Sequence, residues 1–222
     1  MSMEQRALYE CPVLFDEAAH HYTLHGHRLS GDTRIVAWVY PTTYEGMPEA
    51  VLRRAADYGS MIHAKCELAD SLGIVDHDSI RDYVRLKEEA GLVTLCNEHL
   101  VSDEHRIASS IDVLCRDYSI IDIKATSTVH RPLVTLQTSI YAWLLERQNR
   151  HMGLTVPRCF CLWLPKPQYG RSALIPLERI PSDVCEVVVR LWAEGGDAAE
   201  AREMIENINE KMRKENGKSD YR

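Results

Sequence analysis

The sequence predicts a single α/β domain in which helices flank a central mixed β-sheet. Three observations support this fold class. Apolar residues recur at helical spacing over 48–72, 131–150 and 197–216. Apolar segments joined by short polar turns between 92 and 125 favour a three-stranded antiparallel meander. Residues 158–164 are apolar almost throughout, which is typical of a strand buried on both faces.

Turn and capping residues predict the other elements. Region 13–30 favours a β-hairpin that turns at His25-Gly26. Residues 33–40 fit either a strand or a short helix, and Gly59 is a candidate break in the first long helix. The further expected elements are a helix over 78–90, a strand over 172–177, a helix over 181–193 and an amphipathic C-terminal helix over 197–216.

Composition favours an intracellular protein of one domain. The chain has 222 residues, 45% of them hydrophobic, and no run approaches the roughly 20 apolar residues that span a bilayer. The first residues lack a basic segment followed by an apolar one, so we expect a cytoplasmic protein without a secretory signal or membrane contact. Seven cysteines, an odd number without a C-x-x-C pair, predict reduced thiols.

The net charge of −7 excludes a broad basic surface for nucleic acid. Any contact with DNA must therefore be confined to a local groove in which a metal ion supplies positive charge. Four histidines in the N-terminal hairpin are interpreted as exposed imidazoles rather than zinc ligands, because tetrahedral zinc sites usually include thiolates from separate elements. These are His20, His21, His25 and His27.

Two neighbouring strands of the meander carry the residues with the clearest chemistry. Asp112 falls on one strand, and Asp122 and Lys124 fall on the next. Side chains alternate along a strand, so Asp122 and Lys124 point to the same face. Two carboxylates brought together favour a divalent cation such as Mg²⁺ or Mn²⁺ between them. A hairpin with solvated acids is the simpler alternative, but the isoleucines around Asp122 indicate a buried strand, where a charge needs a partner or a function.

Other polar residues are weaker candidates for the same site. Glu98 shares this meander and is left open between an outer or second-metal ligand and a solvated acid. Glu67 lies one helical turn after His63 and either orients that histidine or faces solvent. Arg131 begins the helix after the second strand and is the favoured phosphate contact among the arginines.

Four short motifs together resemble one enzyme family. They are Gly59-Ser-Met-Ile-His63, Ser109-Ser-Ile-Asp112, Asp122-Ile-Lys124 and Gln137-Thr-Ser-Ile-Tyr141. Their order and spacing resemble the RecB-like branch of the PD-(D/E)XK nuclease superfamily, which includes phage-type exonucleases, over about residues 13–165. Ser109 stands where the family pattern has glycine.

The resemblance implies a restriction-endonuclease-like core and a role for each matching residue. Asp112, Asp122 and Lys124 would be catalytic, and Gln137 and Tyr141 would line the site and position substrate. The implied ligands of Mg²⁺ or Mn²⁺ are His63, Asp112, Asp122 and the backbone carbonyl of Ile123. No iron–sulfur cluster is expected, because the cysteine arrangement does not match the members that hold one.

The expected function is metal-dependent hydrolysis of DNA phosphodiester bonds. By family analogy we expect an exonuclease that acts in phage or mobile-element recombination or DNA processing. Its partners would be DNA and a recombination or single-strand-annealing protein, with an oligomer left open. The alternative is a catalytically inactive module of the same fold that binds DNA or a protein, and an RNA-directed nuclease is a third hypothesis.

Overall fold

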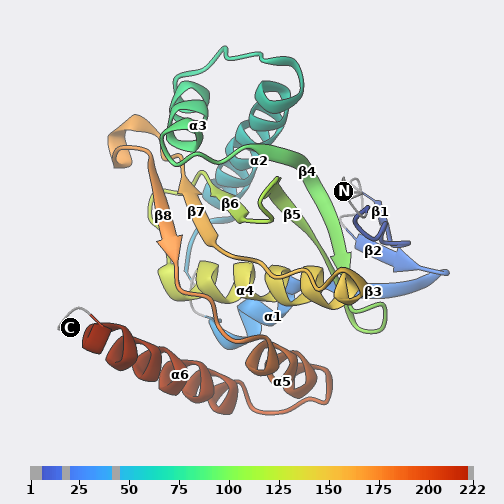
Figure 1. The fold of residues 1–222 in the computed structure, drawn as a ribbon. Coiled ribbons are helices and arrows are strands. Elements are labelled where there is room, and N and C mark those ends of the chain that lie inside the picture. Colours follow the sequence, from blue (N-terminus) through green and yellow to red (C-terminus); the bar gives the residue numbers. More distant parts are fainter. Residues whose placement is uncertain (1–6, 17–20, 42–45, 220–222) are drawn as a thin grey trace.

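A mixed eight-stranded sheet forms the centre of the described structure (Figure 1). The computed structural model describes residues 7–16, 21–41 and 46–219. The strands are β1 (Leu14–Asp16), β2 (His21–Leu24), β3 (His27–Gly31), β4 (Thr94–Ser102), β5 (Ile107–Cys115), β6 (Ile120–Lys124), β7 (Cys159–Trp163) and β8 (Ala173–Leu177). The predicted meander is confirmed, because β4, β5 and β6 pair antiparallel in sequence order. β6 pairs parallel with β7, and β7 pairs antiparallel with β8.

The pairing of β5 leaves an opening in the sheet. β4 pairs with β5 along its length, from Ser102–Ala108 to Thr94–Cys115. On the opposite edge of β5, β3 pairs only at residues 107–108 and β6 only at 113–114. Residues 109–112 therefore have no strand neighbour on that edge, and Ser109 and Asp112 lie at the two ends of the opening.

Helices cover both faces of the sheet, which confirms the predicted fold class (Figure 1). The helices are α1 (Asp32–Val39), α2 (Glu49–Leu72), α3 (Asp78–Glu89), α4 (Arg131–Gln148), α5 (Ser182–Ala193) and α6 (Ala198–Ser219), with short 3-10 turns η1 (Arg150–Met152) and η2 (Pro167–Tyr169). α2 and α3 cover one face, where Ile62 and Tyr83 pack with Ile121 and Leu162. No described helix is both long and apolar enough to cross a bilayer.

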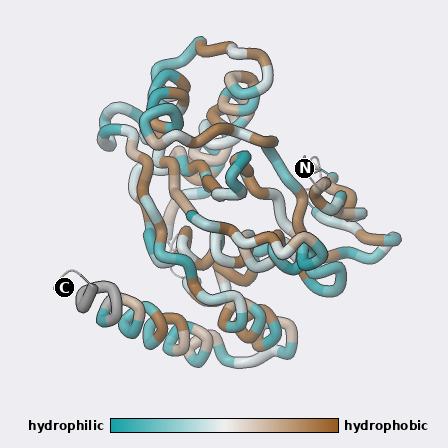
Figure 2. Tube along the Cα trace, in the orientation of Figure 1, coloured by the Kyte–Doolittle hydropathy of each residue, from teal (hydrophilic) through white to brown (hydrophobic). Residues whose placement is uncertain are grey.

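The other face is covered by α4 and α1, with α5 and α6 outside them (Figure 1). Leu136 and Ile140 of α4 pack with Cys159 and Cys161 of β7 in this second core. Apolar and polar residues are interleaved along α6 (Figure 2), as its predicted amphipathic pattern requires. All seven cysteines are free thiols, and Cys159 and Cys161 share this face as their period-two spacing predicts.

The structure decides the elements that the sequence left open. Residues 33–40 belong to a helix, α1, because Ile35, Val36 and Val39 are buried at helical spacing. α2 continues through Gly59 without a break. In the N-terminal hairpin, β2 and β3 turn at His25 and Gly26, whose φ values of 49° and 79° fit the predicted turn. His20 and the N-terminal segment 1–6 lie outside the described residues.

Candidate functional site

The opening beside β5 brings Glu98 and Asp112 close to His63 of α2. Asp112 lies at the edge of the opening, and its Oδ2 accepts a hydrogen bond of 2.6 Å from the backbone N–H of Ile123. The side chain of Asp112 thus takes the place of a missing strand partner. Asp112 is buried, and Asp122 is fully buried on β6. Asp112 of β5 therefore contacts β6 at the residue that follows Asp122.

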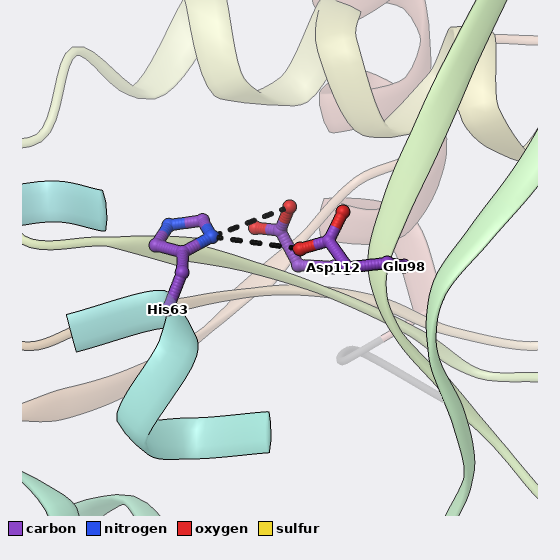
Figure 3. A group of neighbouring side chains, drawn as sticks. All are labelled: His63, Glu98 and Asp112. Carbon is purple, nitrogen blue, oxygen red and sulfur yellow. Dashed lines mark ion pairs between the residues drawn. The ribbon is translucent and has the colours of Figure 1, made fainter. Parts of the chain in front are cut away.

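A tight group of candidate metal-binding atoms lies in this opening (Figure 3). One ligand atom from each of His63, Glu98 and Asp112 lies within 4.8 Å of the others. His63 Nδ1 is 3.8 Å from Asp112 Oδ1 and 3.9 Å from Glu98 Oε1. An imidazole nitrogen with two carboxylates suits a divalent cation, so this donor set fits the metal that the family pattern implies.

The backbone N–H and the backbone carbonyl of Ile123 both contact this group. Its N–H donates to Asp112, and its carbonyl oxygen lies 3.1 Å from His63 Nε2. A carbonyl can only accept a hydrogen bond, so Nε2 carries the proton and Nδ1 is directed toward the carboxylates. In this geometry the oxygen orients the imidazole, and metal binding through the Ile123 carbonyl stays a prediction.

Glu98 enters the group through an unusual backbone conformation. It lies opposite Asp112, between the pairs Asn97–Val113 and His99–Ile111. Its φ of 48° lies in the left-handed region, which is uncommon for a residue with a side chain. Strained backbone of this kind clusters at functional sites. The Glu98 side chain is 49% exposed, so this side of the group is open to solvent.

Asp122 contacts Lys124 rather than the three-residue group. Lys124 Nζ lies 2.8 Å from each carboxylate oxygen of Asp122. The same ammonium donates to Gln137 Oε1 at 3.0 Å, and Gln137 Nε2 donates to the Tyr141 hydroxyl at 2.8 Å. Gln137 and Tyr141 are buried. Their contacts position Lys124, and the positioning of substrate by these two residues stays a prediction.

Burial and neighbouring charges set the protonation of the group. Burial raises the pKa of Asp112 to about 7, and the nearby carboxylates of Asp122 and Glu98 add to this rise. Burial alone would lower the pKa of His63, but the charges of Asp112 and its other acidic neighbours outweigh burial and raise it to about 9. Without a cation, the site therefore keeps protons to limit its negative charge.

The ammonium of Lys124 stays charged. Burial works to lower the pKa of Lys124, but Asp122 and Asp112 outweigh it and hold that pKa above its usual range. Burial also holds the pKa of Tyr141 well above its ordinary value, so its hydroxyl keeps the proton. Lys124 is therefore a fixed positive charge whose side chain remains 22% exposed.

Two other predicted residues lie apart from this group. Arg131 is exposed and donates to the carbonyl of Pro176 at 2.8 Å, a contact that ties the start of α4 to β8. Glu67 is exposed on α2 and is not part of the group around His63. A phosphate contact by Arg131 and a supporting role for Glu67 stay predictions.

The sequence interpretation missed Asp32, the first residue of α1. Asp32 is 2% exposed and accepts a hydrogen bond from the hydroxyl of Ser109, at the other end of the opening from Asp112. Burial raises the pKa of Asp32 to about 6. The available signal was an acid in the first turn of a helix directly after a strand, Gly31-Asp32-Thr33. Ser109 thus provides the partner of a buried acid.

Comparisons with known proteins find only distant similarity to solved structures. A crystal structure of a protein named SSO0001 aligns over 83% of this chain and 79% of its own, with 15% identity and a TM-score of 0.45. An alkaline exonuclease (LHK-Exo) from Laribacter hongkongensis aligns over 84% of this chain and 94% of its own, with 16% identity and a TM-score of 0.41. No protein-family model and no curated protein matches the chain. An interpretation of function therefore depends on the geometry of the site itself.

Proposed function

We propose that this chain is a divalent-metal-dependent deoxyribonuclease. The observation that carries the proposal is a group of carboxylates that outnumber the permanent cations at the opening beside β5, where Glu98 is exposed to solvent. Glu98, Asp112 and Asp122 supply three carboxyl groups, and besides the permanent charge of Lys124 the site offsets them only with protons, on His63 and on Asp112 itself, whose pKa values are both raised. Such an excess is unfavourable without a cation, and a structural ion pair does not need it.

His63, Glu98 and Asp112 would hold Mg²⁺ or Mn²⁺, and Asp122 and the backbone carbonyl of Ile123 are the further candidate ligands. When bound, the metal would polarise the scissile phosphate and lower the pKa of an attacking water. Lys124 would donate from its charged ammonium to a phosphate oxygen and stabilise the charge that builds there. Asp122 and Gln137 hold that ammonium in place before substrate arrives. Water would add to phosphorus and lose a proton to solvent, the P–O ester bond would break, and the leaving oxygen would take up a proton from solvent.

The family resemblance extends the proposal to an exonuclease that acts in phage or mobile-element recombination or DNA processing. A panel of end-labelled linear and circular DNA, single- and double-stranded, with an RNA of the same sequence, tests activity and mode together. We expect degradation of linear DNA that requires Mg²⁺ or Mn²⁺ and ceases with EDTA.

Asp112→Ala, Asp122→Ala and Lys124→Ala should each lower the rate by at least about a hundredfold. Glu104→Ala, in the turn between β4 and β5, is the matched control and should digest DNA like the parent. If all three site variants digest DNA as fast as the parent, the site assignment is wrong. If the folded parent takes up metal and DNA but cleaves none of the panel, the chain is a binding module.

A further inference from the structure

A groove of about 650 Å³ lies directly beside Lys124. One wall is the first half of α2, and a second is the connection 125–130 between β6 and α4. The connection between β7 and β8 contributes Lys166 and Tyr169. Because Lys124 lines this groove and also contacts Asp122, the groove begins at the proposed catalytic group.

Contacts of Trp163 join two of the walls of the groove. The indole N–H of Trp163 donates to the carbonyl of Thr126 at 2.8 Å and anchors the β6–α4 connection. Gly170 lies directly on the Trp163 ring, since a Cβ built at Gly170 would come within 2.9 Å of it. The two connections that form the groove are thus held against each other through Trp163.

The charge of the groove is opposite to that of the whole chain. Among the described residues that line it there is no carboxylate, although the chain carries a net charge of −7. Arg54, Lys124 and Lys166 contribute permanent positive charges. A cationic groove in an acidic chain selects an anionic ligand.

Aromatic side chains accompany these cations. Lys166 Nζ lies 4.5 Å from the centre of the Tyr58 ring, a cation–π contact that holds the ammonium at the groove wall. Tyr169, on the same connection as Lys166, is 52% exposed. Cations that follow a backbone, together with exposed aromatic rings on which bases stack, are the features of single-strand binding sites.

We propose that this groove holds one unpaired strand of DNA, next to the phosphate that lies at Lys124. Tyr169 stacks on a base, and Arg54 and Lys166 contact phosphates. The proposal rests on the proposed function and names its substrate as a single strand or a frayed end. A cavity of this volume is of the size that encloses a small ligand or a short piece of one strand, whereas a duplex needs a far larger surface.

Binding is measured separately from cleavage, by fluorescence anisotropy in Ca²⁺. The probes are a labelled oligothymidylate and a blunt duplex of equal length. We expect the parent to bind the single strand at least about tenfold more tightly than the duplex, and Tyr169→Leu to lose about tenfold for the single strand. Tyr169→Phe keeps a ring for stacking and should bind like the parent. Lys166→Gln should reduce the slope of log affinity against log salt by about 0.7.

Tyr9→Leu is the control for the loss of an exposed tyrosine that does not line the groove, and it should bind like the parent. The groove proposal is overturned if duplex binds as tightly as single strand. Unchanged binding of the oligothymidylate by both Tyr169→Leu and Lys166→Gln overturns it as well. Groove-dependent binding without any cleavage in Mg²⁺ or Mn²⁺ supports the groove and contradicts the nuclease. If Tyr169→Leu and Lys166→Gln cleave DNA with the KM of the parent, the result supports the proposed nuclease activity and contradicts strand binding in the groove.

Discussion

Two clusters of wholly or partly buried polar side chains both include residues of helix α2 and strand β4, and they differ in their charge balance. The first, the Asp70 cluster, consists of Asp70, Tyr83, Lys87, Thr94 and Asn97. Asp70 receives hydrogen bonds from all four of the others, and Lys87 provides a matching positive charge. The second is the group around His63, Glu98 and Asp112, whose acids exceed its cations.

This difference in charge balance distinguishes a cluster that stabilises the fold from a cluster that is suited to binding a ligand. The Asp70 cluster satisfies its acid with protein donors alone and joins α2, α3 and β4. The site group leaves carboxylates facing one another and holds Glu98 in a left-handed conformation. The first cluster should therefore contribute mainly to stability, and the second mainly to activity.

The largest effect on stability should come from Asp70→Ala. This change leaves the buried ammonium of Lys87 without its counter-charge, which costs about 3–5 kcal/mol in the free energy of unfolding. Denaturant unfolding measures the loss, and the fraction that remains folded should keep the nuclease rate of the parent. Glu49→Ala breaks an exposed ion pair on the same helix and should leave the unfolding free energy nearly unchanged. An equally stable Asp70→Ala variant would contradict the structural role.

The two clusters should respond to pH with opposite signs when metal is removed by EDTA. The folded pKa of Asp112 is about 7, above its ordinary value of 3.8. The stability linked to Asp112 is therefore full below 3.8 and is lost as pH rises through about 7. Lys87 and the other donors outweigh burial and lower the pKa of Asp70 below 3.8. The stability linked to Asp70 is present above 3.8 and is lost as pH falls through the folded pKa.

Asp112→Asn should remove the dependence of stability on pH that is linked to Asp112. At neutral pH the metal-free variant should be more stable than the parent by about 1–3 kcal/mol, because one charge leaves an acidic group. Thermal unfolding across pH 4 to 9 in EDTA measures the effect on both proteins. A metal-free variant that is less stable than the parent at neutral pH would mean that the charges are balanced by a contact other than a metal.

A smaller effect is expected at the far end of the opening. Ser109→Ala removes the hydroxyl that donates to buried Asp32 and should cost about 1–2 kcal/mol of unfolding free energy. Ser71→Ala removes an exposed helix hydroxyl and serves as the control, with almost no change. If both substitutions cost the same, Ser109 does not support Asp32.

The sequence predicted the regular elements well, because their signals are local. Helical spacing predicted α4 and α6, and Gly73 and Gly91 mark the ends of α2 and α3 with positive φ. Asp122 and Lys124 share a strand face, and alternation alone predicted that they lie together. The interpretation of residues 33–40 stayed open because eight residues fit either period.

What the sequence did not reveal depends on tertiary contacts. The parallel pairing of β3 with β5 leaves the opening in the sheet, and no local pattern indicates it. Asp32 comes next to Ser109 only through this pairing. The Asp70 cluster joins residues from three elements, so no local pattern in the sequence indicates it. The role of Gln137 as a partner of Lys124 also required the packing of α4 against β6.

Calorimetric titration with Mn²⁺ tests the central claim most directly. The parent should take up Mn²⁺, Asp112→Asn should take up far less, and Asp117→Asn, in an exposed turn of the same hairpin, should behave like the parent. Equal Mn²⁺ uptake by the parent and Asp112→Asn, or none by the folded parent, would contradict a metal centre at this opening.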